Sequence, residues 1–321
     1  MYEKVMIEPI ISLEHIGRVY KLIGEITSFE NARISSIEVL PGGLTNSNYK
    51  VTINEVTYAV RLAGDGTMEY LNRPAEKHNA QVMADIGISA PIIYYDETTG
   101  NQVCKYIDDS ITLHIKDFKE DQYLSLAAYV FRKYHNCGRE FISAFNPLSE
   151  IETYNDLLLE KNFEFYKGAD TMRKKIEDIR EVFENSPPPM APCHNDPLCE
   201  NWLDDQKNFY LIDWEYGGMN DPLFDLGALA IEAELTDEQE HFFLKEYFGG
   251  ELTEKQLGSL VINKFLCDAL WSYWAVLQIA MGKSREEYWP YGLNRFNRAY
   301  SLIRNGSLDR AIEANQGKQN V

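Results

Sequence analysis

Hydrophobic and polar residues alternate in two different ways along this chain, and the change comes near residue 107. Before that point, short runs with the two-residue period of strands predict five strands around one helix. Beyond Ser110, apolar residues recur mostly at helical spacing. The predicted fold class is therefore α+β, with a strand-rich N-terminal domain of residues 1–107 and a mainly helical C-terminal domain of residues 108–321.

Turn residues separate the predicted strands of the first domain. The Gly- and Asn-rich segment P-G-G-L-T-N-S-N lies between the first two strands, and D-E-T-T-G-N joins the last two. The segment G-I-S-A-P ends the predicted helix. The predicted elements are strands at 36–40, 49–53, 56–62, 92–95 and 102–107 and a helix at 76–86.

The second domain is predicted to hold helices on both sides of a short strand–loop–strand element. Its most apolar stretch, residues 265–281, is interrupted by Asp268 and Gln278 and is short for a membrane span, so we expect a buried helix. A small strand-rich domain followed by a larger helical one is the pattern of the bilobal protein-kinase-like fold. The predicted elements are helices at 123–135, 154–166, 172–185 and from 226 to about 304, with strands at 201–203 and 209–212.

The strongest chemical signal is C-H-N-D-P-L-C-E-N-W-L followed by Y-L-I-D-W-E-Y. Phosphoryl transfer needs a carboxylate near the attacking hydroxyl and oxygen ligands for Mg²⁺ on the nucleotide phosphates. Asp196 suits the first role, and Asn201 and Asp213 suit the second. His194 is interpreted as a structural hydrogen-bonding residue. A chance H-x-D beside an ordinary hairpin is the alternative, but three polar positions in the right order after apolar strands favour the kinase interpretation.

The first domain supplies matching parts for a nucleotide. Arg61, on the third strand, stands where protein kinases carry a phosphate-binding Lys, and Glu76 follows at helix distance. A surface salt bridge is the alternative for Arg61, and a plain turn is the alternative for the loop before it. Residues expected to bind the nucleotide through the loop or the hinge are Gly42, Gly43, Asn46, Ser47, Asn48, Lys105, Tyr106 and Ile107.

Composition narrows the class of protein. The 50 acidic residues against 31 Lys and Arg give a net charge of −19, which disfavours nucleic acid as a partner. Five cysteines without C-x-x-C spacing suggest reduced thiols rather than a disulfide framework or a zinc site. Acidic residues interrupt the N-terminal apolar residues, so no signal peptide is expected. We expect a cytoplasmic protein without membrane insertion, and the sequence carries no signal for an oligomeric state.

In these motifs, the sequence resembles the choline/ethanolamine kinase family, most closely the bacterial choline kinases. The resemblance spans nearly the whole chain and implies transfer of the ATP γ-phosphate to choline with Mg²⁺ as the metal. It implies that Asp196 is the catalytic aspartate and that Asn201 and Asp213 are the magnesium ligands. Arg61 and Glu76 are similar to the phosphate-anchoring pair, although some close bacterial relatives carry Lys at the Arg61 position. The matching motifs are G-G-L-T-N-S-N-Y, R-L-A-G-D-G-T, N-R-P-A-E-K-H-N, C-H-N-D-P-L-C-E-N, L-I-D-W-E-Y-G-G-M-N-D-P-L-F-D-L and L-W-S-Y-W.

A quaternary ammonium group such as that of choline is held by aromatic faces. Trp271 and Trp274 lie three residues apart, on one face of a predicted helix. By the resemblance, Trp271, Trp274 and Tyr291 match cage positions and Glu232 matches an acidic pocket position, with Asp196 near the substrate hydroxyl. Core packing is the alternative for the tryptophans, as it is for Tyr288.

Two further residues are expected to have structural roles. His135 is interpreted as a hydrogen-bonded structural histidine, and Asp225 as a residue that braces the catalytic loop.

Other functions remain open from the sequence. An ethanolamine or aminoglycoside kinase of the same fold is one alternative, and the paired tryptophans favour choline over both. A catalytically inactive nucleotide-binding module is another, and the presence of Asp196, Asn201 and Asp213 argues against it. A protein kinase is disfavoured because neither D-F-G nor A-P-E occurs where an activation segment would be.

Overall fold

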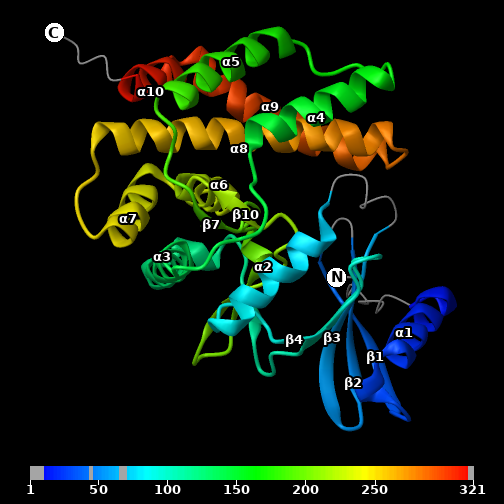
Figure 1. Ribbon diagram of the computed structural model, residues 1–321. Coiled ribbons are helices and arrows are strands. Elements are labelled where there is room, and N and C mark those ends of the chain that lie inside the picture. The colour runs from blue at the N-terminus through cyan, green and yellow to red at the C-terminus, as the bar shows by residue number, and fades with distance from the viewer. Residues whose placement is uncertain (1–10, 43–45, 65–70, 317–321) are drawn as a thin grey trace, which may run out of the picture. The chain divides into compact units, whose positions relative to one another are not determined.

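The computed structural model describes residues 11–42, 46–64 and 71–316, so Gly43 lies outside the described residues. The chain packs into two units (Figure 1). The first comprises Met1–Thr112 and Trp202–Glu215, and the second comprises Leu113–Asn201 and Tyr216–Val321.

The first unit is built on a five-stranded antiparallel sheet in the order β1-β2-β3-β5-β4. All five predicted strands are present, and those at 56–62 and 92–95 have the predicted bounds. The last predicted strand ends two residues early, at Lys105. The strands are β1 (Ile34–Leu40), β2 (Ser47–Ile53), β3 (Val56–Leu62), β4 (Ile92–Tyr95) and β5 (Gln102–Lys105).

One face of this sheet is covered by a helix that the sequence analysis missed, α1 (Leu13–Glu25). The Ser12 side chain caps the helix by accepting the N–H of His15 at 3.1 Å. Val19, Leu22 and Ile23 of α1 pack on the sheet in one buried core. The strand residues of that core are Tyr49, Val51, Ile53, Val60, Leu62 and Val103.

The predicted helix of this unit is α2 (Arg73–Asp85), which begins three residues earlier than expected. Asn72 caps it by accepting the N–H of Ala75 at 3.1 Å, and a proline stands in its first turn. Successive side chains of a strand point to opposite faces, so Arg61, between Val60 and Leu62, points away from the α1 core. It meets Glu76 of α2.

Residues 202–215 join the first unit through a small sheet in the order β6-β8-β9. The hairpin pairs with β6 (Ile111–Thr112), and the N–H of Leu211 donates to the Ile88 carbonyl at 2.9 Å. The strands of the hairpin are β8 (Trp202–Asp204) and β9 (Phe209–Leu211). Asn201 was predicted to begin the first of them, but it ends the preceding short helical turn η4 (Cys199–Asn201). The domain division at residue 107 stays a prediction, whereas this packing groups the hairpin with the first unit.

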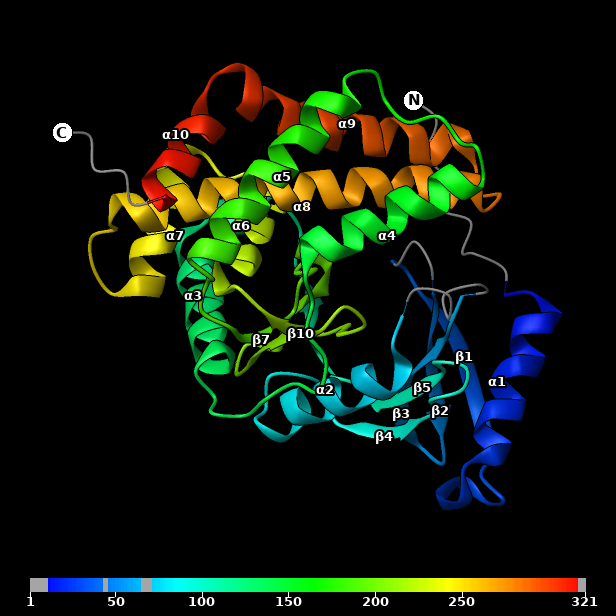
Figure 2. The same cartoon turned by 45° about the horizontal axis from the view of Figure 1, so that its top comes forward.

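The second unit is mainly helical, as predicted. Its longest helix, α8, packs against α4, α5, α6, α9 and α10 (Figure 2). A two-stranded sheet pairs β7 (Ala191–Cys193) with β10 (Gly218–Asn220). The helices are α3 (Asp121–His135), α4 (Pro147–Glu160), α5 (Ala169–Asn185), α6 (Pro222–Glu232), α7 (Asp237–Phe248), α8 (Glu254–Ala280), α9 (Arg285–Arg304) and α10 (Ser307–Asn315).

Capping residues shift the boundaries of two helices from those predicted. The helix expected at 154–166 is α4, which begins at Pro147 because the Asn146 side chain accepts the N–H of Leu148 at 3.0 Å. It ends at Glu160 because Asn162 takes a left-handed conformation, with φ of 50°, that closes the last turn. The helix expected near 226 begins at Pro222, after Asp221 caps it.

Within the described residues, one helix, α8, is long and apolar enough to cross a membrane. However, 89% of its most apolar window is buried inside the structure, which is typical of a core helix. The predicted buried helix at 265–281 is therefore confirmed.

Candidate active site

The loop that carries Asp196 follows β7 and is fixed through its backbone. Asp225 of α6 accepts the N–H of His194 at 2.8 Å and the N–H of Asn195 at 2.7 Å. Asn195 has a φ of 69°, which is uncommon for a residue other than glycine, and its side chain donates to the Tyr216 carbonyl at 2.8 Å. The predicted bracing role of Asp225 is confirmed.

Asp225 is itself held by α3. The Tyr134 hydroxyl donates to it at 2.5 Å, and His135 Nε2 lies 3.2 Å from the same oxygen. His135 Nδ1 pairs with the Tyr247 hydroxyl, so the predicted structural role of His135 is confirmed. Burial alone would raise the pKa of Asp225, but the interactions with His135, His194 and Tyr134 outweigh burial and lower that pKa.

The same loop orients two of the predicted catalytic residues. The backbone N–H of Asp196 lies 3.2 Å from His194 Nδ1, which confirms His194 as a hydrogen-bonding residue of the loop. Asn201 donates through its side-chain N–H₂ to the Asp196 carbonyl at 3.1 Å. This bond engages the amide nitrogen of Asn201, and the predicted role of Asn201 as a metal ligand stays a prediction.

The predicted aromatic residues of the substrate pocket form one cluster in the second unit. The ring centroids of Trp271 and Trp274 are 5.9 Å apart, with an angle of 85° between the rings. Those of Trp274 and Tyr291 are 6.1 Å apart, with an angle of 71°. Tyr288 also packs on Trp274, at 5.7 Å. Both tryptophans are 4% exposed, so they contribute to the core as well.

Electrostatics connects this cluster to the catalytic loop. Burial chiefly raises the pKa of the Tyr291 hydroxyl; Arg295 opposes the rise, and the charges of Glu232 and Asp196 add to it. Tyr291 therefore lies in the field of the Asp196 carboxylate. The structure brings Asp196, Glu232, Trp271, Trp274 and Tyr291 together in the second unit.

In the first unit, Arg61 and Glu76 form the predicted ion pair, and both side chains are buried. Arg61 also donates to Asp213 at 3.2 Å. A second buried arginine, Arg73, donates to Glu76 at 2.5 Å and lies 3.4 Å from Glu215. Two guanidinium groups thus face three carboxylates. The surplus of negative charge suits a bound metal cation, and the carboxylate oxygens suit Mg²⁺.

Glu215 and Asp213 are close enough to influence each other. Burial and the charge of Asp213 raise the pKa of Glu215 to about 7. Asn46 donates to Glu215 at 3.0 Å, and its oxygen accepts the N–H of Gly64 at 3.2 Å. Asn46 therefore holds this cluster together, and its predicted contact with phosphate stays a prediction.

The turn before β2 and the hinge after β5 contain the other predicted nucleotide residues. Gly42 has a φ of 111°, a backbone conformation that favours glycine. Ser47 and Asn48 begin β2. The N–H groups of Lys105 and Tyr106 donate to the carbonyls of Pro91 and Thr57. The roles of these residues and of Ile107 in binding adenine or phosphate stay predictions.

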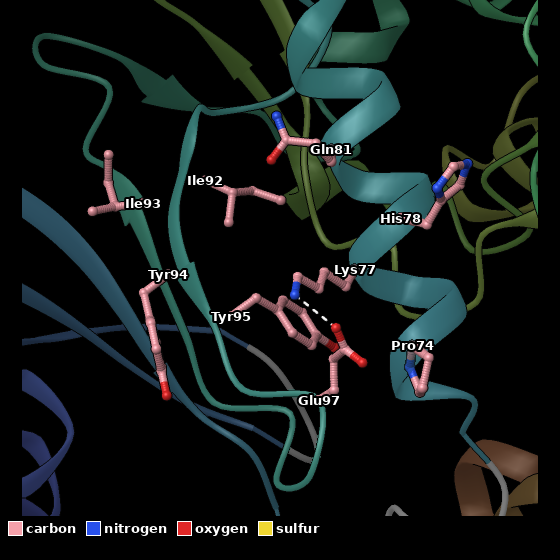
Figure 3. A pocket seen from close by; sticks show the side chains of 9 residues that line it. All are labelled: Pro74, Lys77, His78, Gln81, Ile92, Ile93, Tyr94, Tyr95 and Glu97. Carbon is pink, nitrogen blue, oxygen red and sulfur yellow. Dashed lines mark hydrogen bonds and ion pairs between the residues drawn. The ribbon is translucent and has the colours of Figure 1, made fainter. Parts of the chain in front are cut away.

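Two other features, a hollow and a candidate metal-binding group, were not predicted from the sequence. A hollow of about 600 Å³ opens between α2 and β4 (Figure 3), and Lys77 and Glu97 pair in its lining at 2.6 Å. None of the predicted site residues that the structure describes lines it. His135, Cys193 and Asp225 lie close enough to hold a metal ion. The hydrogen bonds of His135 and Asp225 give this group a structural role instead.

Three residues of these clusters were not predicted as site residues. Arg73 stands three residues before Glu76, Glu215 two residues after Asp213, and Arg295 four residues after Tyr291. A charged residue one helical turn from a predicted site residue is a signal that would have found Arg73 and Arg295.

The antiparallel sheet with α2 on one face, the hairpin that ends before Asp213 and the braced Asp196 loop define a kinase of the protein-kinase-like fold. The family model described as choline/ethanolamine kinase matches residues 37–300. The chain belongs to the choline/ethanolamine kinase family.

Solved structures agree with this assignment. A choline/ethanolamine kinase family protein from Mesorhizobium loti is 31% identical, with a TM-score of 0.82 over 94% of this chain and 99% of that one. The choline kinase LicA from Streptococcus pneumoniae is 30% identical, with a TM-score of 0.77 over 91% and 99%. A structure of LicA in complex with AMP is 29% identical, with a TM-score of 0.76 over 89% and 98%.

Proposed function

We propose that this protein transfers the γ-phosphate of ATP to the hydroxyl group of choline, giving phosphocholine and ADP. The observation that carries the proposal is the cluster of Trp271, Trp274 and Tyr291 in the field of the Asp196 carboxylate. Aromatic faces attract a quaternary ammonium group, which has no N–H to donate. The similar LicA from Streptococcus pneumoniae is a choline kinase, which supports the same substrate.

Asp196 is the residue we assign to the hydroxyl group. Its carboxylate would orient the hydroxyl and accept its proton as the oxygen bonds to the γ-phosphorus and the bond to ADP breaks. The hydrogen bonds from the backbone of His194 and Asn195 to Asp225 would hold the loop that carries this carboxylate in place. Catalysis would come from positioning, because phosphoryl transfer requires little covalent chemistry from the protein.

The nucleotide would be bound through its phosphates and through its metal ion. Arg61, oriented by Glu76, would donate to phosphate oxygens, because a guanidinium group matches them as a fork. Asn201 and Asp213 are the proposed oxygen ligands of Mg²⁺, which would supply positive charge against the phosphates. Further residues proposed to bind the nucleotide are the loop residues Gly42, Gly43, Ser47 and Asn48 and the backbone of residues 105–107.

We also propose that the protein acts in the cytoplasm on a small-molecule substrate. All five cysteines are free thiols, which supports a reducing compartment.

A coupled assay of ADP release across several acceptors tests the function. The panel contains choline, dimethylethanolamine, monomethylethanolamine, ethanolamine and one aminoglycoside, each with ATP and Mg²⁺. We expect kcat/KM to fall along this series as methyl groups are removed, with the aminoglycoside at background. Highest turnover with ethanolamine or the aminoglycoside would contradict choline as the substrate. Nucleotide binding without turnover of any acceptor would indicate an inactive module.

A further inference from the structure

The acidic residue of the proposed choline pocket is already neutralised by an arginine. Arg295 of α9 is 3% exposed, and its NH1 lies 2.6 Å from Glu232 Oε1. Its guanidinium carbon lies 4.5 Å from the centre of the Tyr291 ring, so the same side chain contacts both the acid and the aromatic residue of the pocket.

The neighbouring charges leave Arg295 available to Glu232. Asp268, another carboxylate nearby, is 3.7 Å from Arg295 but accepts two N–H groups of Arg298, at 2.6 and 3.1 Å. Two carboxylates therefore face two guanidinium groups. The Glu232 carboxylate is thus paired with Arg295, and the Asp268 carboxylate with Arg298.

The ion pair of Arg295 and Glu232 has different consequences for the binding of a primary and of a quaternary ammonium group. A primary ammonium group has three N–H donors. Moving it out of water costs free energy unless hydrogen-bond acceptors of the protein replace the water molecules. A trimethylammonium group has no donor, and aromatic faces are sufficient for it. Glu232 and Tyr291 line one cavity of about 180 Å³, together with Arg295.

We propose that Arg295 makes this pocket select quaternary over primary ammonium groups, because its ion pair withholds the Glu232 carboxylate from a substrate N–H. The inference rests on the proposed function and extends it, since it names the residue that sets the choice between choline and ethanolamine. Arg295 is a positioning residue, because it acts through Glu232 and Tyr291.

Steady-state kinetics with choline and ethanolamine test this role in Arg295→Met, Glu232→Gln, the double variant and Arg295→Lys. Arg295→Met frees the carboxylate, so the ratio of kcat/KM for choline to that for ethanolamine should fall about tenfold or more, mainly through KM for ethanolamine. The double variant removes the freed charge and should restore the ratio. Arg295→Lys keeps the ion pair and should stay near the wild-type ratio.

Glu232→Gln keeps the inference testable if Arg295→Met does not fold. A carboxylate that is already withheld contributes little to ethanolamine binding, so the ratio should change less than about threefold. A selective tenfold loss of ethanolamine activity in Glu232→Gln would overturn the inference. An unchanged ratio in folded Arg295→Met would also overturn it.

The wild-type protein separates this inference from the proposed function. Transfer to neither amine would refute the proposed function, and the inference with it. Transfer to choline with a ratio that none of the variants moves would refute the inference alone.

Discussion

Trp274 combines packing with proposed recognition in a single side chain. It contacts Trp271, Tyr288 and Tyr291, and it is almost fully buried in the second unit. A buried aromatic ring contributes to stability through its area and to cation binding through its face. The effect of a substitution at this position on substrate binding must therefore be measured with substrates that differ only in the ammonium group.

Replacing Trp274 with Leu should raise KM for choline by about tenfold, because a desolvated cation–π contact contributes on the order of 1–2 kcal/mol. KM for ethanolamine should change less. Trp274→Phe is the matched control, since it keeps an aromatic face, and thermal unfolding reports whether each variant is folded. Equal changes in KM for both amines would show that the tryptophan only packs.

Residue-level prediction from the sequence succeeded where order along the chain implies proximity in space. The Arg61–Glu76 pair follows from a strand and a helix that are adjacent in the chain, and the structure shows that ion pair. Arg295 was missed because its partner Glu232 is 63 residues away and lies on another helix. The local signal for Arg295 was its place one helical turn after Tyr291, which does not reveal the distant partner Glu232.

At the scale of elements, the conformation of the Asp196 loop depends on two helices, α6 and α3. Asp225 of α6 accepts two backbone N–H groups of the loop, and Tyr134 and His135 of α3 fix Asp225. A buried carboxylate that is satisfied in this way stabilises the loop, whereas an unsatisfied one would destabilise it.

Asp225→Asn should lower the free energy of unfolding by about 2–3 kcal/mol, because an amide offers one acceptor atom where the carboxylate offers two. The folded pKa of Asp225 is lowered, so the contribution is fully present above the unfolded pKa of about 3.9 and is lost as pH falls through the folded value. Urea unfolding of both proteins from pH 8 to pH 3 measures this. The difference should be constant above about pH 5 and shrink at the acid end. A difference that grows toward low pH would contradict the assigned charge state.

Helices and strands were predictable where the spacing of apolar residues and the flanking turn residues indicate the same element. The strand at 56–62 lies between clear turns, and the structure reproduces its bounds. The helix expected at 154–166 was displaced, because the cap at Asn146 and the left-handed Asn162 set its ends rather than its apolar period. Helix α1 was missed although Ile16, Val19, Leu22 and Ile23 have helical spacing after the Ser12 cap.

For the whole molecule, the net charge of −19 favours the approach of a cation over that of an anion. The local balance of charge differs between the cluster around Asp213 and the pair of Glu232 and Arg295. The cluster around Asp213 has a surplus carboxylate, which suits a metal, whereas the pair of Glu232 and Arg295 is neutral. Overall charge therefore says little about which ammonium group is chosen, and the choice is proposed to depend on the aromatic residues and on the pair of Glu232 and Arg295.

The most direct measurement is ³¹P NMR of the wild-type protein and of Asp196→Asn with ATP, Mg²⁺ and choline. We expect the wild type to produce phosphocholine and ADP in equal amounts, because one γ-phosphate moves for each hydroxyl group. Asp196→Asn should bind ATP normally and lose at least two orders of magnitude in rate, on the scale of a lost general base. Inorganic phosphate as the only product of the wild type, or phosphocholine formed at the same rate by Asp196→Asn, would contradict the proposed function.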